Sequence, residues 1–390
     1  MTIASSERFN SALSAARGVL DLIEANREVA EREARMPEEV RRALGDAGLF
    51  AMVAPADCGG LDIDLPELWQ VVETVAEVDA TVSWHLANSG IAGLASLRLD
   101  SASRQELYAD PRFPYGNGGV PAGRAIAVEG GYRLSGRWPF ITGADHTRWN
   151  ALAGLVSSPG DAAVSGGYGS SSARIFIVPS SVLKIERTWD EASGMRGTGS
   201  HAVHVENTFV PARFAPSWAD PPTLPRPWTA LPRALGFGGM MASIMLGILR
   251  AAIDTARQLG ATDSDLHGGR HADQPRHQLV VGEAEAAWQA MQASWHQTAD
   301  RLWDAATARD VGAKLRAEAY GQMFHIVDTV RRNVSELYSV STNAAYRTQN
   351  RVDRALRDAH AASAGIESFR GMQFDAARVL AGGEAHSPAF

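Results

Sequence analysis

The chain has 390 residues, of which 45% are hydrophobic and 21% charged, and its formal net charge is −7. This composition is typical of a globular protein with two or three domains, and the net negative charge argues against nucleic acid or an anionic membrane as a partner. Cys58 is the only cysteine, which excludes an internal disulfide and a zinc site built on cysteines. No signal peptide is recognisable at the N-terminus, so we expect a cytoplasmic protein.

Residues 1–114 have the pattern of a helical domain. Apolar residues recur at helical spacing, and Pro37 stands in the first turn of one predicted helix with acidic residues after it. Another helix is predicted to start at Asp64. A short break at Asp79 precedes a further helix, which we expect to open at Ser83 and to carry Trp84.

Residues 115–214 predict a small β-domain. Short alternating runs indicate strands at 124–128, 132–138, 150–156, 174–179, 184–188 and 202–210. A compact barrel or sandwich is the expected closure of so short a β-domain. The polar stretch 157–172 reads as a flexible loop.

Residues 215–390 predict a helical bundle. Five prolines between 215 and 228 separate it from the β-domain, and helices are predicted at 235–259, 278–308, 311–338 and 352–380. The apolar run 234–249 is short for a membrane span, so a buried helix is expected. The helix 278–308 carries three tryptophans, whose apolar surface suits contacts between subunits. The predicted fold class is therefore α+β, with an all-α domain, a β-domain and a four-helix bundle in that order.

A glycine-rich stretch at 194–200 is the first candidate for a ligand site. Its three glycines let a backbone approach a ligand closely, and Arg196, Thr198 and Ser200 offer donors to an anionic or carbonyl-rich molecule. On this stretch alone, a surface hairpin loop is an equally good interpretation.

Four stretches, in this order and spacing, resemble the acyl-CoA dehydrogenase superfamily and in particular its two-component flavin-dependent monooxygenases. They are residues 37–60, residues 130–143 with Trp149 after them, residues 194–211 and residues 354–361. The resemblance spans nearly the whole chain and implies the three-part fold above with a flavin site. It also implies a homotetramer assembled through the bundle.

The resemblance implies a set of flavin-contacting residues. It places Phe140, Ile141 and Thr142 against the flavin ring, because aromatic and branched side chains pack on a flat ring and a hydroxyl can bond its edge. Asn117 falls on the substrate side of the ring, with Trp84 and Asn88 from the helix that faces it. The remaining cofactor residues implied are Trp189, Arg196, Thr198 and Ser200. For Phe140, and still more for Trp138, packing in the β-domain core is the alternative.

The catalytic base of the superfamily is missing at its usual positions. The glutamate of the dehydrogenases aligns with Ile366, and Glu367 is rotated from that position by about 100° on a helix. The histidine of the hydroxylases aligns with Gly365. Histidine can change its protonation near neutral pH, so His85 is the first candidate to act instead.

Further histidines are candidates with structural alternatives. His360 and His146 follow His85 as catalytic candidates, although His360 lies in a motif of the fold itself. The histidines at 267, 271 and 277 lack a carboxylate or cysteine pattern, so a solvated loop is favoured over a metal site and no metal is predicted.

The implied activity is oxygenation of a small organic substrate with O₂ and reduced FMN or FAD. No Gly-x-Gly-x-x-Gly motif follows a predicted strand, so a separate flavin reductase is expected as a partner. Two alternatives stay open: an acyl-CoA dehydrogenase with tightly held FAD, and a repurposed fold without flavin chemistry. Gly365, and residues 341–343 where relatives often have paired glycines, keep the last one open.

Overall fold

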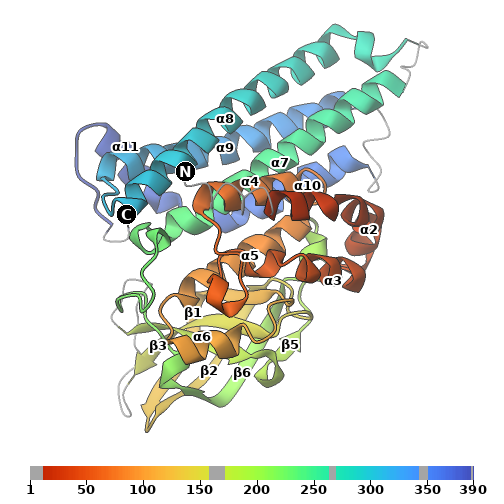
Figure 1. Ribbon diagram of the computed structural model, residues 1–390. Coiled ribbons are helices and arrows are strands. Elements are labelled where there is room, and N and C mark those ends of the chain that lie inside the picture. Colours follow the sequence, from red (N-terminus) through yellow and green to blue (C-terminus); the bar gives the residue numbers. More distant parts are fainter. Residues whose placement is uncertain (1–11, 158–171, 263–268, 342–349, 388–389) are drawn as a thin grey trace.

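The computed structural model describes residues 12–157, 172–262, 269–341, 350–387 and 390. The sheet lies at one end of the molecule, the long C-terminal helices lie at the other, and helix α5 (Ala80–Ser96) runs between them (Figure 1). The other N-terminal helices are α2 (Leu20–Glu33), α3 (Glu38–Asp46), α4 (Leu65–Ala76) and α6 (Ser101–Leu107). The predicted order of helices, strands and helices is confirmed.

The middle of the chain forms one mixed sheet of six strands. Their bounds are β1 (Tyr115–Val128), β2 (Gly131–Ile141), β3 (Trp149–Ser157), β4 (Ala173–Pro179), β5 (Lys184–Glu186) and β6 (His201–Pro211). The strand order is β4-β3-β1-β2-β6-β5; β1 and β3 are parallel, and the other neighbours are antiparallel. The described strands thus form a single sheet with β4 and β5 at its edges, where the sequence analysis expected a barrel or a sandwich.

Strand β1 is longer than the sequence predicts. It begins at Tyr115 instead of Arg124, because its glycine-rich first half pairs with β3 from Tyr115↔Trp149 onward. Glycine has a low strand propensity, so only tertiary pairing makes this segment a strand. The polar stretch 158–171 lies outside the described residues.

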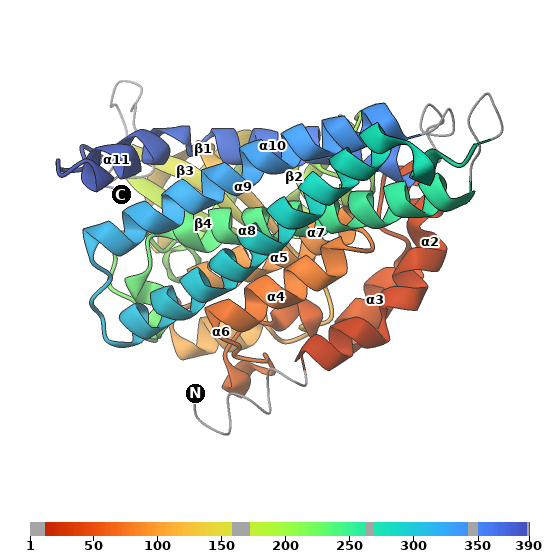
Figure 2. The same ribbon diagram turned by 90° about the horizontal axis from the view of Figure 1, so that it is seen from above.

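The C-terminal helices lie side by side over the rest of the chain (Figure 2). They are α7 (Arg233–Thr262), α8 (Pro275–Thr307), α9 (Ala313–Val340), α10 (Arg351–Glu367) and α11 (Arg370–Leu380). The prediction of one continuous last helix at 352–380 is wrong, because the structure has two helices there. The chain leaves helical geometry between α10 and α11, where the Phe369 N–H donates to the carbonyl of Ile366.

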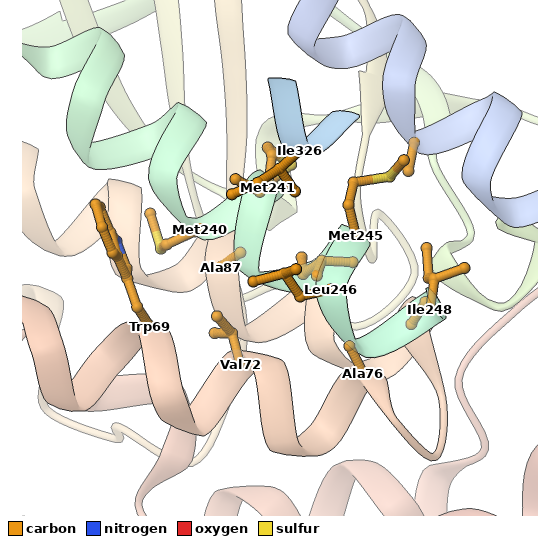
Figure 3. Close-up of a cluster of buried hydrophobic side chains, with 14 of the residues drawn as sticks. Trp69, Val72, Ala76, Ala87, Met240, Met241, Met245, Leu246, Ile248 and Ile326 are labelled. Carbon is orange, nitrogen blue, oxygen red and sulfur yellow. The ribbon is translucent and has the colours of Figure 1, made fainter. Parts of the chain in front are cut away.

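One core joins the N-terminal helices to the bundle. Figure 3 shows Trp69 and Val72 of α4 against Met240 and Leu246 of α7. Trp69 also stacks on Trp295 of α8, with ring centroids 4.4 Å apart. Helix α7 is long and apolar enough to cross a bilayer, but 89% of its most apolar window is buried inside the molecule. It is therefore a core helix, as expected.

The three tryptophans of α8 differ in how deeply they are buried. Trp295 is fully buried, and Trp288 donates its indole N–H to the carbonyl of Leu246 at 3.1 Å. Trp303 packs edge-on against Trp228. Trp295 is therefore not available for subunit contacts, whereas Trp288 and Trp303 are half-buried, and assembly through this helix stays a prediction.

Helix α5 positions the candidate site. It begins at Ala80, three residues before the predicted start, because the Asp79 carboxylate accepts hydrogen bonds from the N–H groups of Thr81 and Val82. The helix contacts β1, α4 and α7. All of its seventeen residues are described, and Trp84 alone is not buried.

Candidate functional site

Two loops meet at one end of the sheet. The first follows β2 and contains Thr142 and Gly143; the second is the glycine-rich stretch 194–200. The N–H of Gly143 donates to the carbonyl of Thr198 at 2.8 Å and joins them. Gly143 has φ +66°, a left-handed conformation that favours glycine. We call residues 140–147 together with 189–200 the two-loop site.

Phe140 points out of the sheet at the edge of the two-loop site. Its side chain is 65% exposed, and its φ is +61°, which is strained for an aromatic residue. The ring lies edge-on to Trp189, with centroids 5.9 Å apart, and the Trp189 indole N–H donates to the carbonyl of Met195. Core packing is therefore the wrong interpretation for Phe140. It is the right one for Trp138, which is fully buried.

Asn117 lies on the sheet face opposite to buried Ile141. Side chains at Gly116 and Gly118 would point toward buried Ile141, so the side chain between them points the other way. Asn117 is half-buried, and its amide makes no hydrogen bond with the described residues. Ile141 supports the loop from the core side.

The hydroxyl groups of the two-loop site bond to one another. The Thr142 and Ser200 hydroxyls are 3.2 Å apart, Ser200 donates to Thr198 at 2.8 Å, and Thr198 donates to the carbonyl of Met195 at 2.7 Å. The three side chains are buried. Arg196 donates to the carbonyls of Glu31 and Ala192. These predicted cofactor residues therefore hold the loop in shape, and their contact with a cofactor stays a prediction.

Side chains of helix α10 hold the glycine-rich loop by hydrogen bonds to its backbone. The Asp358 carboxylate accepts the N–H of Met195 at 2.5 Å, and Arg357 donates to the carbonyl of Ser193 at 2.7 Å. Burial raises the pKa of Asp358 to about 6, although Arg354 opposes the shift. The role of Asp358 was missed from the sequence. Its position in the 354–361 motif was the only sequence feature that pointed to it, because its partner Met195 is 163 residues away in the chain.

His85 lies beneath the two-loop site. Its Nε2 is 3.3 Å from the carbonyl of Gly197, and a side chain at Gly143 would lie 2.9 Å from its Nδ1 and Cε1. Nδ1 is buried and has no hydrogen-bond partner among the described residues. Burial lowers the pKa of His85 to about 4, so the ring is neutral near pH 7. Its geometry is that of a side chain packed between two loops.

His146 lies on the other side of the Gly143 turn. Its Nε2 is 2.8 Å from the carbonyl of Met36, and burial lowers its pKa. It borders a cleft of about 520 Å³ whose lining does not include Phe140, Trp189 or Trp84. The cleft is lined by Glu38, Arg41, Phe113, Asp145, His146, Thr147, Arg148, Pro179, Ser180 and Ser181.

The missing base at the end of α10 is not replaced by its neighbours. Ile366 is fully buried, and the Glu367 carboxylate is bound by Arg370. Gly365 instead faces the indole of Trp84. His360 is exposed and makes no side-chain hydrogen bond with the described residues. On the helix opposite, Asn88 donates to the carbonyl of Trp84 at 2.9 Å.

The histidine-rich loop does not form a cluster in the part of the chain that is described. Position 267 lies outside it, and His277 is buried with Nδ1 3.4 Å from the carbonyl of Val340. Among the described residues, no three His, Cys, Asp or Glu side chains are grouped so that they could hold a metal ion.

The arrangement fits a flat, polar-edged ring such as a flavin. Phe140 and Trp189 supply an aromatic surface, and the Asn117 amide is free to bond a ring edge. Gly143, Gly194 and Gly197 let the two loops pack closely against His85 and the neighbouring helices. At Gly194 and Gly197 a Cβ atom would collide with the carbonyl of Arg357 or the hydroxyl of Thr81.

Comparison with known proteins agrees with this geometry. Residues 14–106 match the family "Acyl-CoA dehydrogenase, N-terminal domain" and residues 239–366 match "Acyl-CoA dehydrogenase, C-terminal domain". The oxygenase subunit HsaA of a flavin-dependent monooxygenase from Mycobacterium tuberculosis is 25% identical over an alignment of 369 residues, and the match covers 90% of each chain.

Two solved structures with bound flavin share the fold. XiaF from Streptomyces, in complex with FADH₂ and glycerol, superimposes with a TM-score of 0.87 at 22% identity, covering 99% of each chain. TdsC from Paenibacillus, with FMN and indole, has a TM-score of 0.77 at 20% identity and covers 93% of this chain and 96% of its own. The two family matches together cover more than half of the 390 residues. Its relative HsaA is a subunit of a flavin-dependent monooxygenase, and the chain itself belongs to the acyl-CoA dehydrogenase superfamily.

Proposed function

We propose that the chain is the oxygenase component of a two-component system. It receives reduced FMN or FAD from a separate flavin reductase and uses O₂ to oxygenate a small organic substrate. HsaA is itself described as an oxygenase subunit, which supports a division of labour between two proteins. The absence of a nicotinamide-binding motif from the sequence supports the same division.

The observation that carries the proposal is the exposure of Phe140. A large aromatic side chain, 65% exposed and held at φ +61°, is unfavourable in water and strained in its backbone. Such strain is common at ligand sites, where the bound molecule covers the side chain. Trp189 lies edge-on beside it, and the two rings form a surface suited to one face of a flavin, whose edge we assign to Asn117.

The residues of the two-loop site then have distinct roles. Phe140 and Trp189 bind the ring, Asn117 bonds its edge, and Thr142 is the hydroxyl nearest to that surface along the chain. Reduced flavin, when bound, supplies two electrons to O₂. One oxygen atom then enters the product and the other becomes water. Arg196, Thr198 and Ser200 keep the glycine-rich loop rigid, so that its backbone can lie along the rest of the cofactor.

His85 has a positioning role in this proposal. Its neutral ring spans the gap between Gly143 and the Gly197 carbonyl and so fixes the distance between the two loops. A direct catalytic role for His85, or for exposed His360, stays a prediction.

The two alternatives predict different behaviour. A dehydrogenase needs a base beside its substrate, and the side chains at 366 and 367 are buried or bound to Arg370. A repurposed fold would bind no flavin. We therefore favour the oxygenase.

Anaerobic titration with reduced FMN and reduced FAD, followed by mixing with ¹⁸O₂ and indole, tests the proposal. We expect one reduced flavin to bind and labelled oxygen to enter the organic product. Tight binding of oxidised FAD with oxidation of an acyl-CoA would support the dehydrogenase instead. If neither flavin binds, both redox functions are excluded.

We further propose that the protein is a cytoplasmic homotetramer. Exposed apolar side chains on the bundle support assembly, since Leu279 is 60% and Phe374 67% exposed. Light scattering of the purified protein measures the oligomeric state directly, and a monomer at micromolar concentration would contradict this part of the proposal.

A further inference from the structure

His201 is a fully buried histidine at the first position of β6. Its register partner in β2 is Ile141, the residue between Phe140 and Thr142. The second part of the two-loop site ends at Ser200, immediately before the histidine. His201 therefore lies where both parts of the two-loop site join the sheet.

The imidazole of His201 holds the backbone of Trp189. Its Nδ1 accepts a hydrogen bond from the N–H of Trp189 at 3.1 Å. The indole N–H of Trp189 donates to the carbonyl of Met195, and its own carbonyl accepts the N–H of Ala192, each at 3.0 Å. Of these three bonds, only that of the Trp189 backbone N–H depends on the side chain of another residue. It is therefore the bond that a substitution elsewhere in the chain can remove.

The bond to Trp189 fixes which nitrogen of His201 carries the proton. A ring nitrogen that accepts a hydrogen bond has no proton, so the neutral ring is protonated at Nε2. Nε2 is buried and has no hydrogen-bond partner among the described residues. It lies 3.8 Å from a carboxylate oxygen of Asp145 and 3.8 Å from one of Asp190. Both carboxylates favour an N–H at this position and thus the form that the Trp189 bond requires.

The charged groups that face His201 belong to the loop after β2 and to the segment after β5. Asp145 comes from the first, and Arg187 and Asp190 come from the second. Arg187 donates to Asp190 at 2.9 and 2.7 Å and to Asp145 at 3.2 Å. Burial and the Arg187 guanidinium lower the pKa of His201, while the two carboxylates oppose the shift. The ring is therefore mainly neutral at pH 7.

A second proton on the ring would break the bond to Trp189. It would enter at Nδ1 and replace the lone pair that accepts the Trp189 N–H. Two N–H groups would then face each other, and the backbone of Trp189 would have to move. The indole of Trp189 lies edge-on to Phe140, with ring centroids 5.9 Å apart, so this aromatic pair would be disturbed.

We propose that His201 is a positioning residue that sets the orientation of Trp189 for flavin binding, and that protonation of His201 weakens this binding. The inference rests on the proposed function and adds a residue that acts on the cofactor through Trp189. Because burial keeps the pKa of the ring below its usual 6.5, flavin affinity is highest near pH 8 and decreases as the pH falls below that value.

Anaerobic titration with reduced FMN and reduced FAD tests the inference. His201→Ala removes the acceptor of the Trp189 N–H and should weaken flavin binding about tenfold at pH 8, as expected for a buried donor without a partner. His201→Asn keeps an acceptor oxygen near the position of Nδ1 and should stay within about threefold of the wild type.

The pH dependence of flavin affinity distinguishes positioning from a purely structural role. The affinity of each variant is divided by that of the wild type at the same pH, so that the titration of the flavin itself cancels. Between pH 8 and about pH 5 the wild type should approach His201→Ala, and His201→Asn should gain relative to the wild type. His204→Asn, which changes a half-exposed histidine of the same strand, should keep a constant ratio.

The protonated nitrogen can also be identified without flavin. In ¹⁵N spectra of the histidine-labelled protein, the His201 signals are assigned by their loss in His201→Asn. We expect a neutral ring with its proton on Nε2 at pH 7. Failure of the wild type to bind flavin would remove the proposed function, but these spectra would still report on the bond to Trp189.

Wild-type flavin affinity in His201→Ala at every pH would overturn the inference. A constant ratio between His201→Asn and the wild type over the whole pH range would overturn it as well. A neutral ring with its proton on Nδ1 would show that Trp189 is not held in this way. If circular dichroism shows that His201→Ala is unfolded, the pH series of His201→Asn and the ¹⁵N spectra decide the question.

Discussion

At the scale of single residues, the site is defined by side chains whose surroundings are unusual for their type. Phe140 is exposed and strained, while His85 is buried and neutral. The resemblance to the family places both residues near a flavin. Their different exposure to solvent indicates that they have different roles. Phe140 can touch a ligand, whereas His85 touches the two loops that carry it.

Phe140→Ala should weaken reduced-flavin binding about tenfold, because it removes an aromatic contact with the ring. The free energy of unfolding should change by less than about 0.5 kcal/mol, since the side chain makes little contact in the free protein. Phe209→Ala is the matched control, because Phe209 is also an exposed strand residue, at 43%. Equal losses of flavin affinity in both variants would show that Phe140 has no special role.

His85 should make stability depend on pH. Its pKa is about 4 in the folded protein and 6.5 in the unfolded chain, so only the unfolded chain takes up a proton as the pH falls between these values. The stabilisation is fully present above pH 6.5 and decreases toward pH 4, by about 3 kcal/mol in total.

Urea unfolding of the wild type and of His85→Gln at several pH values measures this effect. The difference in unfolding free energy between the two proteins should become less favourable to the wild type as the pH falls. His325→Gln, which changes an exposed histidine of α9, should run parallel to the wild type. A pH-independent difference for His85→Gln would show that the ring does not titrate as described.

At the scale of elements, α10 and the glycine-rich loop act as one unit. Asp358 and Arg357 hold the backbone on either side of Gly194, and Arg354 pairs with the Asp79 cap of α5 at 2.8 Å. A single helix thus fixes both the loop and the start of the helix that carries Trp84.

Asp358→Ala should weaken reduced-flavin binding about tenfold, because the Met195 N–H loses its acceptor and the loop becomes mobile. Asp358→Asn keeps an acceptor oxygen and should lose less than about threefold, within the range of a weakened hydrogen bond. Asp254→Ala, on α7, removes surface ion pairs with Arg250 and Arg257 and serves as the control. Isothermal titration of the three variants decides between them.

The elements themselves were largely predictable, and the exceptions have a common cause. Local signals such as the Asp64 cap and the proline-rich 215–228 segment locate helices and breaks correctly. The glycine-rich half of β1 and the break at Phe369 were missed, because pairing with β3 and packing against Phe237 decide them. The residues that resemble a known family were found, whereas partners far apart in the chain, such as Asp358 and Met195, leave no local pattern.

At the scale of the whole molecule, the N-terminal helices and the bundle share a core. The Trp69–Trp295 stack crosses between them, and Gly239 of α7 admits the Trp69 ring, since a Cβ atom there would lie 1.9 Å from it. We therefore expect the helical parts to unfold together.

Trp295→Ala should lower the free energy of unfolding by about 3–5 kcal/mol, as expected for a large buried aromatic side chain. Trp295→Phe should lower the free energy of unfolding markedly less, because the phenylalanine ring fills most of the space of the indole. Calorimetry and far-ultraviolet circular dichroism should give one coincident transition for the wild type. Separate transitions for the two helical parts would contradict the shared core.

The position of α7 also has a consequence for synthesis in the cell. The apolar side of α4 is covered by α7, which is made roughly 160 residues later in the chain. At about 5–20 residues per second, translation leaves Trp69 and Val72 without their partners for roughly 8–30 s. During this interval the apolar side of α4 is exposed on the nascent chain, and the sheet is not yet complete. Ribosome-associated chaperones would therefore find their binding sites in α4, and slowing translation after position 76 should increase aggregation of the nascent chain.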